Sequence, residues 1–419
     1  MPMAVRLTGD YARLWLASGT SSLGDGVTIA AGPLLMATVS SDPAVVAGAV
    51  FAQQLPWLLF SLFSGVFVDR VDRRAVVGAV GAARALVMAV LAVLVWRDLA
   101  SIPVIYAAVF LLGTGATLSD NAGQALVPSV VATGDLARAN AWISGVRMVC
   151  NQFGGPPMGG WLFAVAAAVP FGVDAVCFVA SSALVLSLAG RKAAPAAGPR
   201  SPDGSTARAS VRQEIGDGLR WLWNRSALRM LAVAMGLMNI SYGGAFAAYV
   251  LYARERLGFS EVGYGFLLAA TAVGGVVGTV SVARLDARFG AATLLRAGMV
   301  VETLTHLVLA VTRSPWVAGL TLVLFGAHAT IWGVVSVTLR QRVTPEGMLG
   351  RINSVYLLFS MGGFAIGSLL GGLVGHAFGI VAPFWAAFAA MTVMTAAAWR
   401  VMVPAALSPR ATEPARSPA

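Results

Sequence analysis

Charged side chains are scarce in this chain. Asp, Glu, Lys and Arg make up 11% of its 419 residues, whereas a soluble domain carries about 25%. Hydrophobic residues make up 58%, which excludes an ordinary water-soluble enzyme. Cysteine occurs only twice, as Cys150 and Cys177, in two different apolar segments. Because a disulfide needs closely spaced Cα atoms, we interpret both as small packed residues.

Signatures of nucleotide-driven or catalytic chemistry are also missing. No Gly-x-x-x-x-Gly-Lys-[Ser/Thr] motif occurs, which argues against an ATP-driven process. No arrangement of a nucleophile, His and Asp indicates a catalytic triad. Glu302 and His306 lie one helical turn apart, but they are two metal ligands without a third. We therefore expect no enzyme, no cofactor and no metal.

Long apolar segments dominate the chain instead. A helix needs about 20 apolar residues to span the hydrocarbon of a bilayer. Twelve segments qualify, six on each side of a polar stretch at 191–229. They lie at residues 13–39, 44–68, 75–96, 102–126, 142–166, 169–189, 228–252, 262–283, 291–312, 316–338, 354–376 and 380–403. The sequence therefore predicts an all-α membrane protein.

The two halves of the chain repeat one another. QALVPSVVATGDLARAN at 124–140 corresponds to QRVTPEGMLGRIN at 341–353, because both contain Gln, three residues and Pro, then Leu-[Ala/Gly]-Arg-x-Asn. DRVDRR at 69–74 corresponds to ARLDAR at 283–288, and GPPMGG at 155–160 to GSLLGG at 367–372. Repeated halves in an apolar chain are typical of transporters. We predict two pseudo-symmetric six-helix bundles.

The positive side chains behind the formal net charge of +11 lie mostly in loops, and they do not form one nucleic-acid-binding surface. Most arginines occupy alternate loops, which is the positive-inside pattern. We therefore expect an inner-membrane protein with both termini in the cytoplasm, in contact with lipid but not with nucleic acid. The predicted organisation is a bundle at 1–190, a linker with an amphipathic helix at 191–227, a bundle at 228–404 and a tail at 405–419.

Local motifs add a family resemblance over about residues 10 to 405. The segment from Gly65 to Arg74 reads GVFVDRVDRR, and it resembles the Gly-x-x-x-Asp-Arg-x-Gly-Arg-Arg/Lys loop signature of the major facilitator superfamily. Asp72 replaces the second Gly of that signature. With LWLASGTSSLGDG at 14–26 and LARAN at 136–140, the chain is similar to the branch of enterobactin exporters and macrolide-efflux proteins. The resemblance implies the major facilitator fold and a monomeric secondary transporter.

The loop signature is interpreted as a cytoplasmic gate. Asp69, at the end of one helix, can stabilise the positive N-terminus of a neighbouring helix. Arg73 can pair with Asp120 inside the fourth segment. The resemblance implies that such contacts close the cytoplasmic side in the outward-facing state; the alternative is that the arginines only keep the loop inside. The predicted gate residues are Gly65, Asp69, Arg70, Arg73, Arg74 and Asp120.

A second motif lies in the fifth segment. Gly155, Pro156, Gly159 and Gly160 match the end of an antiporter motif, Gly-Pro-x-x-Gly-Gly, although Asn151 stands where the fuller motif has Gly. The resemblance favours export. Helix packing without directional meaning is the alternative, since small residues let helices approach closely.

Asp25, Arg84 and Glu302 are the predicted proton-coupling residues. Ionisable side chains inside a membrane are costly and usually face a cavity or a partner. Asp25 and Glu302 are the carboxyls suited to exchange protons, whereas a structural pair with Arg84 is an equal alternative for Asp25. For His306 and His328 we expect ordinary interior hydrogen bonds.

The substrate cavity is expected to be apolar and aromatic. Such a lining suits amphipathic molecules better than sugars. The candidate wall residues are Gln53, Trp57, Asn151, Asn239, Tyr242, Trp332 and Tyr356. We predict export of a small amphipathic molecule, such as a drug, siderophore or secondary metabolite, and the family resemblance implies that protons drive it. The alternatives are proton-symport import of a nutrient, lysolipid flipping, or sensing by a transport fold.

Overall fold

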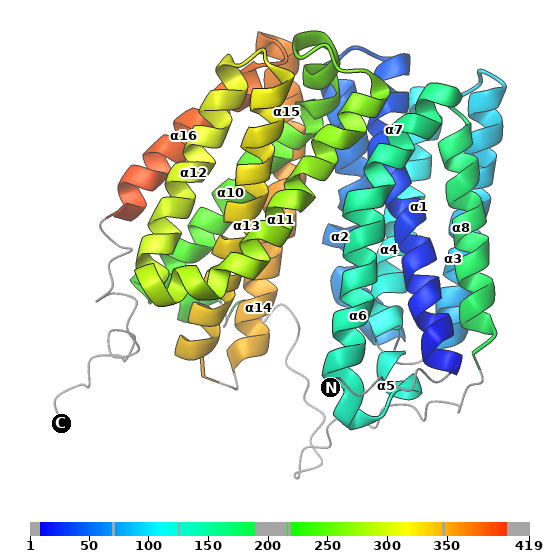
Figure 1. The fold of residues 1–419 in the computed structure, drawn as a ribbon, viewed down its shortest axis with the longest axis horizontal. Helices are drawn as coiled ribbons and strands as arrows, with labels where there is room; N and C mark the ends of the chain where they lie inside the picture. Colours follow the sequence, from blue (N-terminus) through cyan, green and yellow to red (C-terminus); the bar gives the residue numbers. More distant parts are fainter. Residues whose placement is uncertain are drawn as a thin grey trace. The chain divides into compact units, whose positions relative to one another are not determined.

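The computed structural model describes residues 9–68, 72–124, 126–188, 216, 219–345 and 348–399. Within these residues the chain is helical and contains no strand (Figure 1). Eleven of its helices are long and apolar enough to cross a membrane. The segment expected at 142–166 is also helical, formed by three consecutive elements. The prediction of an all-α membrane protein is confirmed.

In the part of the first half that the structure describes there are ten elements. They are α1 (Gly9–Val39), α2 (Pro43–Val68), α3 (Arg73–Trp96), α4 (Ile102–Gln124), α5 (Val127–Val130), η1 (Thr133–Asp135), α6 (Leu136–Met148), η2 (Val149–Gly154), α7 (Gly155–Val165) and α8 (Val169–Leu186).

The described residues of the second half form nine elements. They are α10 (Ser226–Leu251), η3 (Tyr252–Arg256), α11 (Glu261–Phe289), α12 (Ala291–Val311), α13 (Pro315–Val343), α14 (Leu349–Leu357), η5 (Leu358–Gly362), α15 (Gly363–Phe378) and α16 (Ala382–Trp399).

Local sequence explains several helix ends. Asp72 precedes α3 and accepts a hydrogen bond from the backbone N–H of Arg74, at 2.9 Å. Ser314 precedes α13 and accepts from Val317 in the same way. Such caps satisfy backbone donors that have no partner inside the helix. At Gly379, φ is +92°, a conformation that favours glycine, and α15 ends directly before it.

The chain divides into two compact units. Unit 1 comprises residues 1–41, 52–206 and 259–269, and unit 2 comprises 42–51, 207–258 and 270–419. The start of α2 therefore groups with unit 2, and the start of α11 with unit 1. The domain limits expected from the sequence stay a proposal. Of the predicted amphipathic linker helix, residues 219–223 are described as helical, and the tail at 405–419 lies outside the described residues.

Helix packing follows the repeat. In unit 1, α1 packs against α7 and α8, and α3 packs against α4 and α8. In unit 2, α10 packs against α15 and α16, and α12 packs against α13 and α16. Each pair in one half thus has its counterpart in the other half. The π-helical turns η2 and η5 also correspond, because each directly precedes a glycine-rich helix. Such turns often occur at functional sites.

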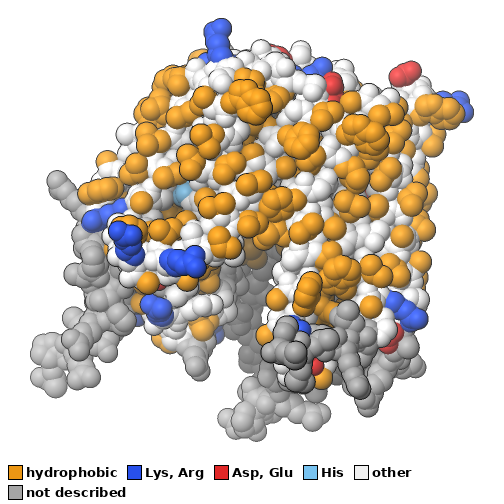
Figure 2. Space-filling view, in the orientation of Figure 1, with side chains coloured by type: hydrophobic (Ala, Val, Ile, Leu, Met, Phe, Trp, Pro, Cys, Tyr) orange, Lys and Arg blue, Asp and Glu red, His pale blue; other side chains and the backbone are white. Residues whose placement is uncertain are grey.

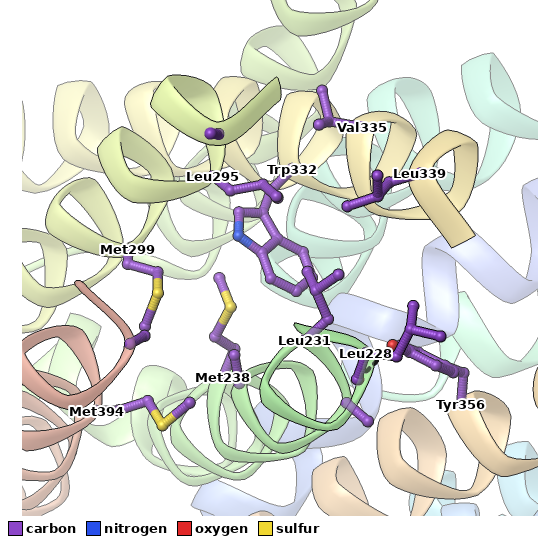
Figure 3. Close-up of a cluster of buried hydrophobic side chains, with 14 of the residues drawn as sticks. Leu228, Leu231, Met238, Leu295, Met299, Trp332, Val335, Leu339, Tyr356 and Met394 are labelled. Carbon is purple, nitrogen blue, oxygen red and sulfur yellow. Dashed lines mark hydrogen bonds between the residues drawn. The ribbon is translucent and has the colours of Figure 1, made fainter. Parts of the chain in front are cut away.

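Each unit has a hydrophobic core. In unit 2 the core gathers Leu, Met and aromatic side chains from α10, α12, α13, α14 and α16 (Figure 3). In unit 1 a smaller cluster around Tyr11 and Leu14 joins α1 to α6. Hydrophobic side chains cover the sides of the helices on the face seen in Figure 2, and charged side chains lie mainly near helix ends. This distribution fits a lipid environment.

Candidate functional site

The interior of unit 1 contains an ion pair between α1 and α3. An Nη2 nitrogen of Arg84 contacts Oδ1 of Asp25. The Arg84 side chain is 8% exposed, whereas that of Asp25 is 36% exposed. The guanidinium carbon of Arg84 also lies 4.0 Å from the ring centre of Phe178 on α8, a cation–π contact. The pairing that the sequence left as an alternative for Asp25 is therefore present.

Asp174 of α8 is a second carboxyl beside this pair. It is fully buried, and Thr28 Oγ1 donates a hydrogen bond to its Oδ2 at 2.6 Å. Its Oδ1 has no hydrogen-bond partner among the described residues. Asp174 lies within electrostatic range of both Asp25 and Arg84. Gly24 makes this approach possible, since a Cβ there would stand 2.0 Å from Asp174 Oδ1.

The charges of this cluster do not cancel. Two ionised carboxylates and one guanidinium give a net charge of minus one in a largely buried site. Charge in a medium of low dielectric is costly unless it is paired. One bound proton would neutralise the cluster. Asp25 is the more exposed of the two carboxyls, since Asp174 is fully buried.

Sequence reasoning did not assign Asp174 to a site. Spacing along one helix says nothing about contacts with another helix. The one available signal was the number of ionisable residues in the first six segments. Three of them, on α1, α3 and α8, meet in the folded unit.

A buried cluster in unit 2 surrounds Glu302. His328 Nε2 on α13 lies 2.7 Å from Glu302 Oε2, and His306 Nε2 on α12 lies 3.3 Å from Oε1. All three side chains are at most 5% exposed. The expected interior hydrogen bond is present for His328. It is absent for His306, because neither ring nitrogen of His306 has a hydrogen-bond partner among the described residues.

The structure also adds one side chain, His328, to the potential metal-binding groups that the sequence indicated at this site. Two potential ligands were expected, and His328 makes a third. The described residues nevertheless contain no group of three His, Cys, Asp or Glu side chains arranged to hold a metal ion. The cluster is therefore interpreted through its charges and protons.

The predicted gate is only partly described. Asp69 and Arg70 lie outside the described residues, and Gly65 lies in α2. Arg73 and Arg74 begin α3, where Arg74 donates to the carbonyl of Leu186 at the end of α8. Asp120 forms an ion pair with Arg147 of α6 at 2.7 Å, a partner that the sequence analysis did not consider. Its pairing with Arg73 stays a prediction.

The glycines of the antiporter-like motif bring α7 against α1. A Cβ at Gly155 would lie 2.5 Å from the Cα of Gly26, and one at Gly159 would lie 2.3 Å from the carbonyl oxygen of Val27. Pro156 is buried at the start of α7, beside Gly159 and Gly160. The packing interpretation of the motif thus has a direct structural basis. Its meaning for transport direction stays a prediction.

The predicted cavity residues occupy different environments. Gln53 and Trp57 are half-buried on α2. Asn151 lies in η2, and Asn239 of α10 accepts a hydrogen bond from Ser360 of η5 at 3.4 Å.

Three other predicted cavity residues are aromatic. Tyr242 of α10 stacks on Phe325, with ring centres 5.3 Å apart. Trp332 and Tyr356 lie in the hydrophobic core of unit 2, with 4% and 2% exposure (Figure 3).

The chain is a multi-pass membrane transporter of the major facilitator superfamily. Its long apolar helices, a helix packing that recurs in each of the two units, and its buried ionisable clusters agree with that class. Within that superfamily the chain belongs to the family described as transmembrane secretion effector, which matches residues 3–417. The family and the fold are those of transporters rather than of enzymes.

Named relatives include exporters. The chain is 26% identical over 395 residues to the multidrug efflux pump Tap of Mycolicibacterium fortuitum, covering 90% of this chain and 92% of that one. It is 29% identical over 277 residues to the enterobactin exporter EntS of Shigella dysenteriae, covering 64% and 62%. An uncharacterized MFS-type transporter of Sinorhizobium fredii, y4rN, is 25% identical over 341 residues, covering 80% of each chain.

Solved structures share the fold. A bacterial homologue of the iron transporter ferroportin, in an inward-facing state, has a TM-score of 0.73 at 20% identity, covering 94% of this chain and 98% of that one. The nucleoside transporter NupG has a TM-score of 0.74 at 10% identity, covering 94% and 99%. These likenesses confirm the major facilitator fold that the sequence motifs imply.

Proposed function

We propose that this transporter exports a small amphipathic organic molecule in exchange for protons. The observation that carries the proposal is the cluster of Asp25, Arg84 and Asp174 in unit 1. Arg84 pairs with Asp25, and Asp174 lies within electrostatic range of both, so the cluster is neutral only when it also holds a proton. A site of this kind can couple the arrival of a proton to a change in its contacts.

The three residues have different roles in this proposal. Asp25 is the proton carrier, since it is the carboxyl with access to water. When Asp25 is protonated, Arg84 balances the charge of the buried Asp174. When Asp25 loses its proton, it competes with Asp174 for the same guanidinium. Asp174 therefore acts as a positioning residue, and its hydrogen bond from Thr28 fixes its orientation.

Several observations support export of an amphipathic molecule. The names of two relatives are those of a drug efflux pump and a siderophore exporter. The antiporter-like motif in α7 agrees with that direction. Drugs, siderophores and secondary metabolites are the substrate classes proposed. The chain would work as a monomer, and its two six-helix bundles would alternate access across the membrane.

The arginine-rich loops support an orientation with both termini in the cytoplasm of a bacterial inner membrane. The loop between α2 and α3 then contributes the cytoplasmic gate, together with Asp120. The ion pair between Asp120 and Arg147 adds a second contact on the same helix, α4. A charge swap of Arg73 and Asp120 that restores transport would support their coupling, because a double-mutant cycle isolates the pairwise interaction.

The experiment begins with a substrate search. A deletion strain and an overexpressing strain are compared by metabolite and drug-resistance profiling, and the compound found is then tested in membrane vesicles. Proton-driven export predicts uptake into inverted vesicles that collapses when the pH gradient is dissipated. Uptake into right-side-out vesicles would instead establish an importer, and movement of lysolipid alone in liposomes would establish a flippase. Either result would overturn the proposal.

A further inference from the structure

Unit 2 holds a buried cluster of three ionisable side chains, Glu302, His306 and His328. Glu302 and His306 face the same side of α12 because they are four residues apart. His328 reaches them from α13, where its ring nitrogen lies 2.7 Å from the carboxylate. Gly298, one turn before Glu302, lets α13 approach, since a Cβ there would stand 3.1 Å from His328 Nδ1 and 2.7 Å from the indole of Trp332.

Polar atoms in this cluster are poorly satisfied. His306 Nδ1 and Nε2, His328 Nδ1 and Glu302 Oε1 have no hydrogen-bond partner among the described residues. The 3.3 Å contact between His306 Nε2 and Glu302 Oε1 is therefore longer and less well directed than the 2.7 Å contact of His328. Trp332 Nε1 on α13 also has no hydrogen-bond partner among the described residues (Figure 3). Buried polar groups without partners are rare in native proteins and require an explanation.

The groups around Glu302 include no cation other than the two imidazoles, as far as the described contacts go. Tyr242 of α10 lies within electrostatic range of Glu302. From α16, Thr395 contacts Thr303 and the carbonyl of Met299 on α12, and threonine carries no charge. With both imidazoles neutral, an ionised Glu302 leaves one net negative charge at a site that is at most 5% exposed.

One proton removes this imbalance. It converts the cluster either to a neutral carboxylic acid with two neutral imidazoles or to an imidazolium paired with a carboxylate. Both forms have no net charge, whereas a second proton would leave the cluster positive. Since an uncompensated charge in a buried site is expensive, the singly protonated cluster is the favoured one.

We propose that Glu302, His306 and His328 form a proton-binding site of unit 2 that holds one exchangeable proton. Uptake transfers a proton from water to the cluster, and release returns it to water, with no other bond made or broken. The use of this proton in transport rests on the proposed function, whereas its binding is testable without any substrate. Unit 2 then has a proton site of its own, in addition to Asp25 of unit 1.

Ring contacts give the site a connection to α10. Tyr242 stacks on Phe325, and Phe325 meets the ring of His328 edge to face, with centres 5.8 Å apart. Tyr242 is one of the predicted cavity residues. A change of charge on His328 would therefore act on a ring that contacts Tyr242. This contact is the path by which the proton of unit 2 would influence a bound substrate.

The small number of histidines makes the test selective. The chain contains only His306, His328 and His376. His376 is a built-in reference, because its side chain is 61% exposed and pairs with Asp42 instead of Glu302. The purified wild type, labelled with 15N in histidine, is titrated by NMR between about pH 5 and pH 8. Proton uptake over the same range is measured by potentiometric titration.

Glu302→Gln is the main variant and His376→Gln the matched control. Relative to wild type, Glu302→Gln should bind about one proton fewer at the cluster, because neutralising the carboxylate removes the charge that holds it. It should change the signals of His306 and His328 and leave that of His376 in place. His376→Gln should remove only its own signal. If Glu302→Gln binds as many protons as wild type and leaves both buried histidine signals unchanged, the proposal is overturned.

A second variant covers the possibility that Glu302→Gln does not fold. His328→Gln keeps a side chain that can donate to Glu302 but cannot carry the proton. It should shift the titration of His306, and an unchanged His306 titration would contradict a shared site. Different results would disprove the proton site of unit 2 and the proposed export function. Wild-type vesicles without substrate-driven proton movement would defeat the export proposal while leaving this titration as it stands.

Discussion

Asp25 on α1 and Arg84 on α3 form an ion pair, although the two residues are 59 positions apart in the sequence. The pair is not isolated, because the buried carboxyl of Asp174 on α8 lies within electrostatic range of both groups. An ion pair with a third, like-charged group beside it can exist in two arrangements. The proposed proton exchange at this site requires that property.

Replacing Asp25 by Asn should abolish uphill transport and leave downhill exchange of substrate. Asn keeps the shape of the side chain but cannot lose a proton, so Arg84 would pair permanently with Asp174. The ratio of substrate concentration inside and outside inverted vesicles should fall to that of passive equilibration. Each factor of ten in this ratio corresponds to about 1.4 kcal/mol. Substrate-induced proton release in proteoliposomes should disappear.

Asp98→Asn is the matched control for this variant. Asp98 is exposed after the end of α3, at φ +55°, a conformation that Asn tolerates. It should transport like wild type. Full proton-coupled transport by Asp25→Asn would show that Asp25 is not the carrier. If Glu302→Gln lost coupling in the same experiment, the carrier of the transport cycle would lie in unit 2.

Arg84→Ala should destabilise the protein strongly, and Asp174→Asn should partly reverse the loss. Removing the guanidinium leaves two carboxyls within electrostatic range of each other. Breaking a buried ion pair typically costs about 3–5 kcal/mol, and the low end applies here because Asp25 is 36% exposed. Neutralising Asp174 removes one of the two carboxylates. The melting temperatures of both single variants and the double variant form a thermodynamic cycle. Strictly additive changes would show that Arg84 and Asp174 are energetically independent.

The sequence predicted the helices better than the site. Long apolar segments are local signals, so they predicted the eleven described helices that are long and apolar enough to cross a membrane, and the segment expected at 142–166 is helical as well. Asp174 and His328 could not be assigned partners, because their partners lie on other helices and depend on how those helices pack. Trp332 and Tyr356 were expected on a cavity wall, since aromatic residues suit both a wall and a core. Sequence alone does not distinguish the two environments.

Gly159→Ala should lower stability, whereas Gly145→Ala should not. A methyl group at position 159 would lie 2.3 Å from the backbone oxygen of Val27, so α7 would have to move away from α1. Overpacking of this kind costs about 1–3 kcal/mol. Position 145 on α6 has no atom within 4 Å of an added Cβ, and Ala is favoured over Gly in a helix by up to about 1 kcal/mol. Thermal unfolding in detergent compares the two, and equal melting temperatures would contradict close packing of α7 on α1.

Asp42 should make stability depend on pH at the start of α2. Its Oδ1 accepts a hydrogen bond from the backbone N–H of Ala44 at 2.8 Å and lies 2.9 Å from His376 Nδ1. The backbone hydrogen bond, followed by the contact with His376, holds the pKa of Asp42 below its ordinary value, although burial opposes them. A carboxyl with a lowered pKa stabilises the fold above its unfolded-state pKa, and that stability is lost as the pH falls through the folded-state pKa.

Asp42→Ala should therefore lower the melting temperature near neutral pH, with a gap to wild type that narrows below about pH 4. An N-terminal cap contributes about 0.5–2 kcal/mol, and the low end applies here because the side chain is 34% exposed. Asp42→Asn is the informative comparison, since Asn can still cap the helix but cannot titrate. It should keep most of the stability and lose the pH dependence. A gap between Asp42→Ala and wild type that stayed constant from neutral pH into the acid range would show that the charge of Asp42 contributes nothing.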